Sequence, residues 1–245
     1  MIKIKKKLKE LLEDPVYVKL KRHLSINVNP DQIEHYAVPY EEIIEAYSKS
    51  KSFYMKLKHY IKLKRVPFVI PKSKNIPVEL FENDEIKFQL MKDLWVKKFE
   101  YKKTARYSEL LERMKGDKPV TLKKKYDFKT EEDLKEYFKD YEALLKSMSE
   151  NGYNLNIKQD ELMVWIGPDG EMIKSIAGRH RMAAAKIVGA PFVPVRIRHI
   201  HQNWAEKVLG RKITSPELLT TDDLLVVISK SKEMYAVEPD LNSKV

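Results

Sequence analysis

Two apolar runs joined by a tight turn restrict the fold of this chain more than any other feature of its sequence. The runs are residues 161–166 and 171–176. Between them stands Gly167-Pro168-Asp169-Gly170, whose final Asp-Gly pair favours a tight reversal of the backbone. The two runs are therefore predicted to be strands that pair as a hairpin, with Asp169 serving the turn.

A helix and a third strand are predicted to follow this hairpin. Residues 182–188, Met-Ala-Ala-Ala-Lys-Ile-Val, are strong helix formers, and Gly189 is suited to end the helix. Residues 193–198 then alternate apolar side chains with arginines, as a strand does. Because the three alanines are small, the helix can lie close against a sheet, and its N-terminal end is expected to be rigid.

The loop that opens this helix is Gly178-Arg179-His180-Arg181. A helix N-terminus presents unpaired N–H groups and the positive end of the helix dipole, so it stabilises an anion. Gly178 permits a positive φ, while the next three residues add cations that are unfavourable there unless an anion compensates. The loop therefore predicts a phosphate site. The alternative is that Gly178 only makes the turn and that the side chains point to solvent or to nearby carboxylates.

The same residues match a known family pattern. Residues 176–189 and the following Val193-Pro-Val-Arg-Ile resemble the ParB/sulfiredoxin superfamily, whose hallmark is Gly-x-(His/Arg)-Arg opening a helix, then Gly, then Val-Pro-Val. The resemblance is close over roughly residues 160–200. It implies an α+β fold with a small mixed sheet and helices. By position it also implies that Gly178 is the turn glycine and that His180 and Arg181 hold nucleotide phosphates.

Two departures from the family limit what the resemblance implies. Sulfiredoxins need a cysteine where this chain has Arg179, and the chain contains no cysteine, so sulfinic acid reduction is excluded. ParB proteins continue into a Glu-Asn-x-Gln-Arg type segment and a helix-turn-helix domain. Here Arg198-His-Ile-His-Gln-Asn-Trp204 follows instead, and only about 40 residues remain. A partition-type DNA clamp is therefore not expected.

The chain is expected to divide into three parts: a mainly helical or irregular extension or lid, the ParB/sulfiredoxin-like domain, and a poorly packed tail. These parts span residues 1–105, 106–228 and 229–245.

Several elements are predicted outside the central unit. Within the extension, helices are predicted over residues 2–13 and from Val38 towards Lys64, and residues 66–71 suit an edge strand or loop because they contain two prolines. No prediction is made for residues 72–106.

Two further helices are predicted ahead of the hairpin. Ser108 is expected to cap a helix that runs to Met114. Thr130-Glu-Glu-Asp133 resembles a capping box, and an apolar stripe from Leu134 to Met148 follows before Gly152 ends the helix. The stripe, rich in tyrosine and leucine, is predicted to be core. A short helix is also expected beyond Trp204.

Charge and composition indicate the classes of partner. The formal charge of +11 and pI of about 9.4 suit nucleotides, nucleic acid, acidic lipids or phosphorylated substrates. Much of the excess is lysine dispersed along the first half, which is more typical of a solvated basic face than of a specific site. The sequence shows neither a transmembrane segment nor a secretion signal, so a cytoplasmic protein is expected.

Candidate catalytic residues are His180 in the loop and Asp160 and Glu161 just before the first hairpin strand. Phosphoryl transfer needs a carboxylate to hold Mg²⁺ or to accept a proton. Glu41 or Glu42 at a helix start are equal alternatives. Secondary candidates for the phosphate pocket lie on the strand that follows the helix: Arg196, Arg198 and His199.

Three other side chains permit both a functional and a structural interpretation. His199 and His201 form a His-x-His pair that would share one face of a strand, but two ligands do not make a metal site. Trp204 stands near a cluster of cations and is suited to stack on a base or to pack in the core.

Two functions are consistent with these residues. The first is a nucleotide-dependent enzyme, a phosphotransferase or nucleotidase, with ATP or CTP at Gly178 to Arg181, Mg²⁺ on the phosphates, and an unidentified acceptor substrate. The second is a nucleic-acid-binding or nuclease-like protein whose loop meets a backbone phosphate while the dispersed lysines supply non-specific attraction.

Overall fold

The computed structural model describes residues 14–38, 67–116, 120–122, 126–153, 162–175 and 178–238. The helices predicted over residues 2–13 and from Val38 towards Lys64 lie outside these ranges or at their edge. None of the helices in the described ranges is both long and apolar enough to cross a membrane.

The main sheet contains seven strands within the described ranges, in the order β1-β9-β7-β8-β2-β4, with β3 paired to β9. A separate hairpin, β5-β6, pairs Val120–Leu122 with Tyr126–Phe128. The main strands are β1 (Ser25–Val28), β2 (His35–Ala37), β3 (Val69–Ile70), β4 (Val78–Leu80), β7 (Leu162–Ile166), β8 (Met172–Lys174) and β9 (Val193–His201).

The predicted hairpin and third strand form the centre of this sheet. β7 and β8 pair antiparallel across the turn at Gly167 to Gly170, and β9 runs parallel to β7. A parallel neighbour requires a crossover connection, which the predicted helix supplies. The α+β class with a mixed sheet is confirmed.

The first 105 residues differ from the expected helical extension. Their described part contributes β1, β2, β3 and β4 to the same sheet, with β1 antiparallel to β9 and β2 parallel to β8. Residues 69–70 form the strand allowed for in the proline-flanked segment, and they pair with the distal end of β9. These strands are two to four residues long, so their pairing depends on distant partners.

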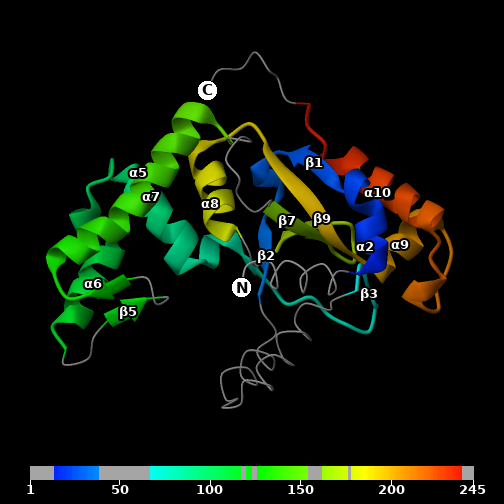
Figure 1. The fold of residues 1–245 in the computed structure, drawn as a ribbon, viewed down its shortest axis with the longest axis horizontal. Helices are drawn as coiled ribbons and strands as arrows, with labels where there is room; N and C mark the ends of the chain where they lie inside the picture. Colours follow the sequence, from blue (N-terminus) through cyan, green and yellow to red (C-terminus); the bar gives the residue numbers. More distant parts are fainter. Residues whose placement is uncertain are drawn as a thin grey trace, which may run out of the picture.

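Helices flank the sheet on two sides. Figure 1 shows α5, α7 and α8 to one side of the strands and α2, α9 and α10 to the other. The helices are α2 (Pro15–Leu20), α5 (Leu90–Val96), α6 (Ala105–Met114), α7 (Glu131–Asn151), α8 (Arg179–Val188), α9 (Gln202–Leu209) and α10 (Thr221–Tyr235). Shorter turns of 3₁₀ helix are η1 (Lys21–His23), η2 (Pro30–Gln32), η3 (Phe81–Asn83), η5 (Tyr101–Lys103) and η6 (Pro216–Leu218), while η4 (Glu85–Gln89) is a π-helical turn.

The two best-defined helices have the predicted ends. α7 begins with a reciprocal capping box between Thr130 and Asp133, and Gly152 follows its last residue. Its apolar stripe is buried or packed against the core. α8 ends at Gly189, which adopts the left-handed conformation, and its alanines 183–185 are fully buried. The small side chains therefore let α8 pack closely, as predicted.

Two predicted boundaries are wrong. α6 starts after Thr104, whose side chain accepts a hydrogen bond from the Tyr107 N–H, so Ser108 lies inside the helix. The chain after Ser229 is not a loose tail, because α10 continues to Tyr235 and Ser231 is fully buried there. The four polar residues from Ser229 to Lys232 give no sign of this helix in the sequence. Ser231 is buried because it bonds Trp204, which is distant in the chain.

Candidate phosphate-binding site

Gly178 joins the hairpin side of the sheet to α8. It has φ 78° and ψ 16°, which is the left-handed region that glycine adopts without strain, and no side chain caps the helix. A Cβ atom placed on Gly178 would lie 2.6 Å from Leu162 Cδ2, 3.5 Å from an Arg181 guanidinium nitrogen and 3.8 Å from Lys174 Nζ. Both the conformation and the close packing on β7 therefore require glycine.

Arg179 is held on the side of the loop that faces β2 and η4. One of its guanidinium nitrogens donates to Asp84 Oδ2 at 3.1 Å, and its guanidinium lies 4.4 Å from the centre of the Tyr36 ring. The Arg179 side chain is only 15% exposed, and its Nε is buried without a hydrogen-bond partner in the protein. A hydrogen bond from this buried Nε to an incoming acceptor would stabilise the folded protein, because the donor would no longer be buried unpaired.

Asp84 has no counterpart in the sequence predictions. Its carboxylate is 5% exposed, accepts from the Lys87 N–H as the cap of η4, and pairs with the Lys87 ammonium at 3.3 Å. Since Asp84 binds both Lys87 and Arg179, its single negative charge is shared between two cations. The local signal was an aspartate directly before a helical turn, which indicates a cap but not a partner 95 residues away.

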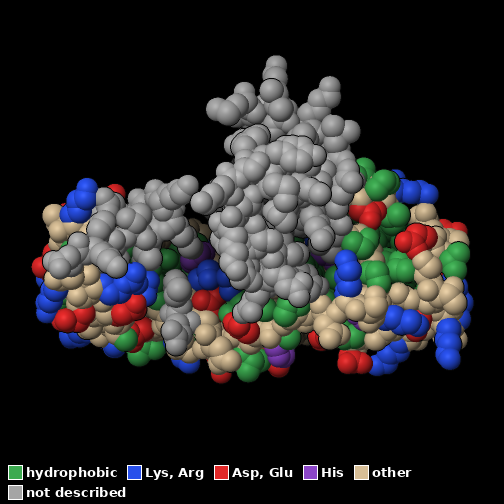
Figure 2. Space-filling model, turned by 90° about the horizontal axis from the view of Figure 1, so that it is seen from below, with side chains coloured by type: hydrophobic (Ala, Val, Ile, Leu, Met, Phe, Trp, Pro, Cys, Tyr) green, Lys and Arg blue, Asp and Glu red, His purple; other side chains and the backbone are tan. Residues whose placement is uncertain are grey.

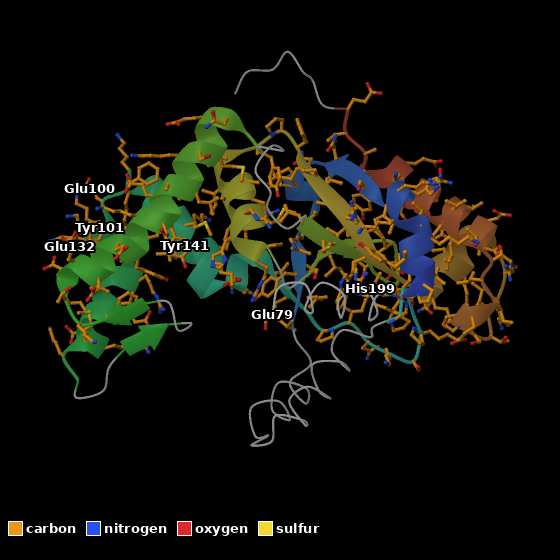
Figure 3. The ribbon with its side chains drawn as sticks, viewed as in Figure 1. Glu79, Glu100, Tyr101, Glu132, Tyr141 and His199 are labelled. Carbon is orange, nitrogen blue, oxygen red and sulfur yellow. The ribbon has the colours of Figure 1, made fainter. Side chains whose placement is uncertain are left out.

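Tyr36, which packs against Arg179, is itself bonded to a glutamate. The hydroxyl of Tyr36 hydrogen-bonds the carboxylate of Glu79 on the neighbouring strand β4. Burial, aided by Glu79, raises the pKa of Tyr36 to about 12, so the hydroxyl keeps its proton at neutral pH. Glu79 is exposed and is labelled in Figure 3. The Tyr36 ring thus supports Arg179 from a fixed position.

Arg181 lies at the C-terminal end of α7, and His180 lies beside its middle. An Arg181 guanidinium nitrogen donates to the Tyr153 hydroxyl at 3.0 Å, just beyond the glycine that ends α7. The His180 ring lies 5.7 Å from the Tyr141 ring, centre to centre. Figure 3 shows Tyr141 on the stretch of α7 that runs beside α8. The helix predicted as core therefore also positions two residues of the loop.

Lys174, the last residue of β8, is the main functional candidate that the sequence predictions missed. It is fully buried, and its ammonium donates to the backbone carbonyls of Met163 and Ser175, at 3.0 Å each. Burial, together with the nearby Arg181 and Arg179, lowers the pKa of Lys174 to about 7. In the strand pattern Lys174 was one polar residue among apolar ones, which gave no sign that it points inward.

Among the described residues around Gly178, cations outnumber carboxylates. Lys174 and Arg181 lie beside Gly178, Arg179 follows it in the chain, α8 has no acidic residue in its first turn, and Asp84 is the carboxylate bonded to Arg179. Cations at a helix N-terminus oppose the helix dipole. An anion placed there would offset both kinds of repulsion, so the arrangement suits a phosphate group.

Arg196 and Arg198 lie on β9 and interact with the N-terminal elements. Arg196 Nε donates to Ser25 Oγ on β1 at 3.4 Å, and the Arg198 guanidinium lies 4.0 Å from the centre of the Tyr17 ring on α2. The structure therefore gives Arg198 a packing partner on the side of the sheet that α2 covers. Neither contact involves the loop at Gly178.

His199 is buried away from the loop as well. Its Nδ1 lies 2.8 Å from the Pro67 carbonyl, so this nitrogen carries the hydrogen, and its ring meets Trp165 edge-on at 5.0 Å. Figure 3 places His199 across the sheet from Tyr141. Burial lowers the pKa of His199 to about 3, so the ring is neutral at pH 7 and supplies no charge to a phosphate.

The other residues with two interpretations also have structural contacts. His201 accepts from the Asn203 N–H with Nδ1 and contacts the Lys74 carbonyl with Nε2. Trp204 is buried and donates to Ser231 Oγ at 2.9 Å. Within the described ranges, no group of three or more His, Asp or Glu is arranged to hold a metal ion.

Of the candidate acids named from the sequence, only Asp169 lies within the described residues. Asp160, Glu161, Glu41 and Glu42 lie outside the described residues. Asp169 serves the β7-β8 turn, where its N–H donates to Glu171 at 2.8 Å. Asp84 is therefore the described carboxylate bonded to a residue of the loop.

No family model, curated protein or solved structure matches this chain. The loop and the side chains around it are therefore what indicates a function for this chain.

Proposed function

We propose that this chain is a nucleotide-dependent enzyme, a phosphotransferase or nucleotidase, that binds the phosphates of ATP or CTP at the N-terminus of α8. The observation that supports this most directly is the meeting of Lys174 and Arg181 within 3.8 Å of one point beside Gly178. Arg179 is the next residue along the chain, and its guanidinium pairs with Asp84. A phosphate chain has the charge to satisfy all three cations.

The roles of the three loop side chains differ in this proposal. Arg181 contacts phosphate oxygens directly, with Tyr153 fixing its direction. Arg179 contributes its buried Nε while Asp84 and Tyr36 hold the guanidinium in place. His180 lies beside Tyr141 and serves as the proton donor or acceptor.

Magnesium enters the proposal through the nucleotide. Mg²⁺ in nucleotide sites is held by substrate phosphates with one or two carboxylates, and keeps several waters. The described residues therefore need to provide only a single carboxylate near the phosphates. The resemblance of the loop to the ParB/sulfiredoxin superfamily supports the same assignment, with Gly178, His180 and Arg181 as the matching positions.

Nucleic acid is the second candidate, and the net charge of +11 favours it. On the face shown in Figure 2, however, the Lys and Arg side chains of the described residues are interspersed with Asp and Glu. A continuous basic stripe is the usual footprint of a nucleic-acid interface. The described residues on this face therefore favour the nucleotide proposal.

The test compares nucleotide binding by the wild-type chain with binding by Arg181→Ala. Calorimetric titrations with ATP, CTP, ADP and GTP, each with and without Mg²⁺, are expected to show saturable binding of at least one triphosphate. Because a hydrogen bond to a charged group contributes about 1.5–3 kcal/mol, Arg181→Ala should weaken that binding by roughly 10- to 100-fold. Arg113→Ala is the matched control, since Arg113 lies on α6 and pairs with exposed Glu109.

Two results would contradict the proposal. One is the absence of binding for all four nucleotides. The other is binding that Arg181→Ala and Arg113→Ala weaken equally. If the chain instead binds duplex DNA with an affinity that falls steeply with salt, the nucleic-acid candidate replaces the first.

A further inference from the structure

Arg179 uses only part of its guanidinium for contacts inside the protein. Its Nη1 donates to Asp84 Oδ2 at 3.1 Å, whereas its Nε is buried and donates to no atom of the protein. A guanidinium carries its N–H donors in a rigid planar fork, in which the Nε–H and Nη1 lie on different edges. Arg179 can therefore keep its bond to Asp84 and donate to an anion oxygen at the same time.

An ion pair that only tied α8 to η4 would explain less of this geometry. A lysine carries a single charged nitrogen and would make such a pair without leaving a second donor buried. A buried N–H without a partner lowers the stability of the folded chain, so the guanidinium is unfavourable here unless an acceptor reaches Nε. An anion bound at the loop would supply that acceptor.

Asp84 is also the residue from which η4 begins. Its Oδ1 accepts from the Lys87 N–H at 3.0 Å, and its carbonyl accepts from the N–H groups of Phe88 and Gln89 at 2.9 and 3.0 Å. The bond from Gln89 has the i→i−5 spacing of a π-helix, a rare element that is frequent at functional sites. The position of Arg179 and the first turn of η4 therefore depend on the same aspartate.

A row of buried aromatic rings fixes this segment against the sheet. The guanidinium of Arg179 lies 4.4 Å from the centre of the Tyr36 ring on β2. The Tyr36 ring lies 5.5 Å from that of Phe81 on η3, which lies 6.4 Å from that of Phe88 on η4. Both contacts of the guanidinium, with Asp84 and with the Tyr36 ring, therefore lead to η3 and η4.

We propose that η4 is part of the anion site: Asp84 is a positioning residue that holds Arg179 through Nη1, and a phosphate-class anion bound through Nε stabilises η4 in return. This inference rests on the proposed function, because the anion is the one bound at Gly178 to Arg181. The coupling is reciprocal, so loosening the contact with Asp84 weakens anion binding by the factor by which the anion stabilises that contact. Arg179→Lys should remove the coupling, because one ammonium cannot hold both partners in the geometry of the fork.

The first test measures the affinity for sulfate, a tetrahedral dianion, by calorimetric titration at constant ionic strength. Asp84→Asn keeps an oxygen that can cap η4 but removes the charge that holds Arg179, so it should weaken sulfate binding by about fivefold or more. In the Arg179→Lys background the same substitution should change the affinity by less than about twofold, because the side chain on which Asp84 acts is gone. A purely structural role of Asp84 would weaken binding equally in both backgrounds.

Asp223→Asn is the matched control for this substitution. Asp223 also takes part in a helix cap, at the start of α10, and it also pairs with an arginine, Arg211, at 2.8 Å. Its replacement should leave sulfate affinity unchanged in both backgrounds.

Hydrogen exchange of the wild-type chain gives a second readout that needs no substitution. Saturating sulfate should slow exchange of the Lys87, Phe88 and Gln89 amides by about fivefold or more, relative to sodium chloride of equal ionic strength. The amides of α10 should exchange at the same rate in both salts. In Arg179→Lys the protection of η4 should be lost.

Failure of the coupling and failure of the anion site give different results. Sulfate binding that depends on Arg181 but leaves exchange of η4 unchanged would refute the coupling, and the anion site would stand. Equal effects of Asp84→Asn with and without Arg179→Lys would also overturn the role of Asp84. If neither sulfate nor any nucleotide binds, both proposals fail. The exchange measurement on the wild-type chain decides the question even if Asp84→Asn does not fold.

Discussion

Replacing Gly178 with alanine is expected to lower the stability of the fold in two ways. The first is backbone strain, because φ at Gly178 is 78° and an L-residue in the left-handed region lowers the unfolding free energy by about 1–2 kcal/mol. The second is a steric clash, because the new Cβ would lie 2.6 Å from Cδ2 of the fully buried Leu162. Overpacking of this kind costs about 1–3 kcal/mol. The expected loss of unfolding free energy is therefore about 2–5 kcal/mol.

Gly189→Ala is the matched control for this substitution. Gly189 ends the same helix with φ 70°, but a Cβ there would meet no atom within 4 Å. Gly189→Ala should therefore lower the unfolding free energy only by the backbone strain, which is about 1–2 kcal/mol. The difference between the two variants measures the clash with Leu162.

Equilibrium unfolding in urea gives both free energies, and a double variant tests the assignment. Gly178→Ala combined with Leu162→Ala should be less destabilised than the sum of the single variants, because the smaller side chain removes the clash. Equal stability of Gly178→Ala and Gly189→Ala would refute the reasoning. So would strict additivity with Leu162→Ala.

Two further predictions concern buried polar groups. The pKa of Lys174 is about 7 in the folded chain and about 10.4 in the unfolded chain, so the unfolded state binds more protons between these pH values. The free energy of unfolding should therefore rise from pH 7 to 9 by up to about 1 kcal/mol per pH unit. Thermal unfolding of the wild type and of Lys174→Met as a function of pH checks this, and identical pH slopes would contradict it. Ser231→Ala removes the acceptor of the buried Trp204 N–H and should cost about 1–3 kcal/mol in urea unfolding, whereas a loss no larger than that of Ser229→Ala would show that the bond contributes little.

The parts of the fold that could be predicted from the sequence depend on local signals. The β7-β8 turn, the capping box of α7 and the two glycines around α8 each determine their structure within a few residues. The same locality explains why Gly178 to Arg181 could be identified as a helix start. Chemistry at a helix N-terminus depends on that helix and on the residues next to it.

Residues whose role depends on distant partners could not be found in this way. β1 to β4 are short strands that pair with β9, β8 and one another, so their own patterns are weak. Asp84 acquires its role only because the fold brings it to Arg179. Lys174 occupies an ordinary polar position in a strand, and its complete burial becomes evident only in the folded chain. His199 had a favourable location in sequence, but its side chain packs on Trp165.

The burial of Lys174 also bears on the choice between the two functions. A nucleic-acid backbone lies on the surface of a protein and gains affinity from many exposed lysines, each of which contributes a similar share. A side chain with no exposed surface gains little from such a partner. The proposed binding of nucleotide phosphates at the loop should therefore depend more on Arg181, whose guanidinium lies 3.5 Å from the Cβ position of Gly178, than on total salt.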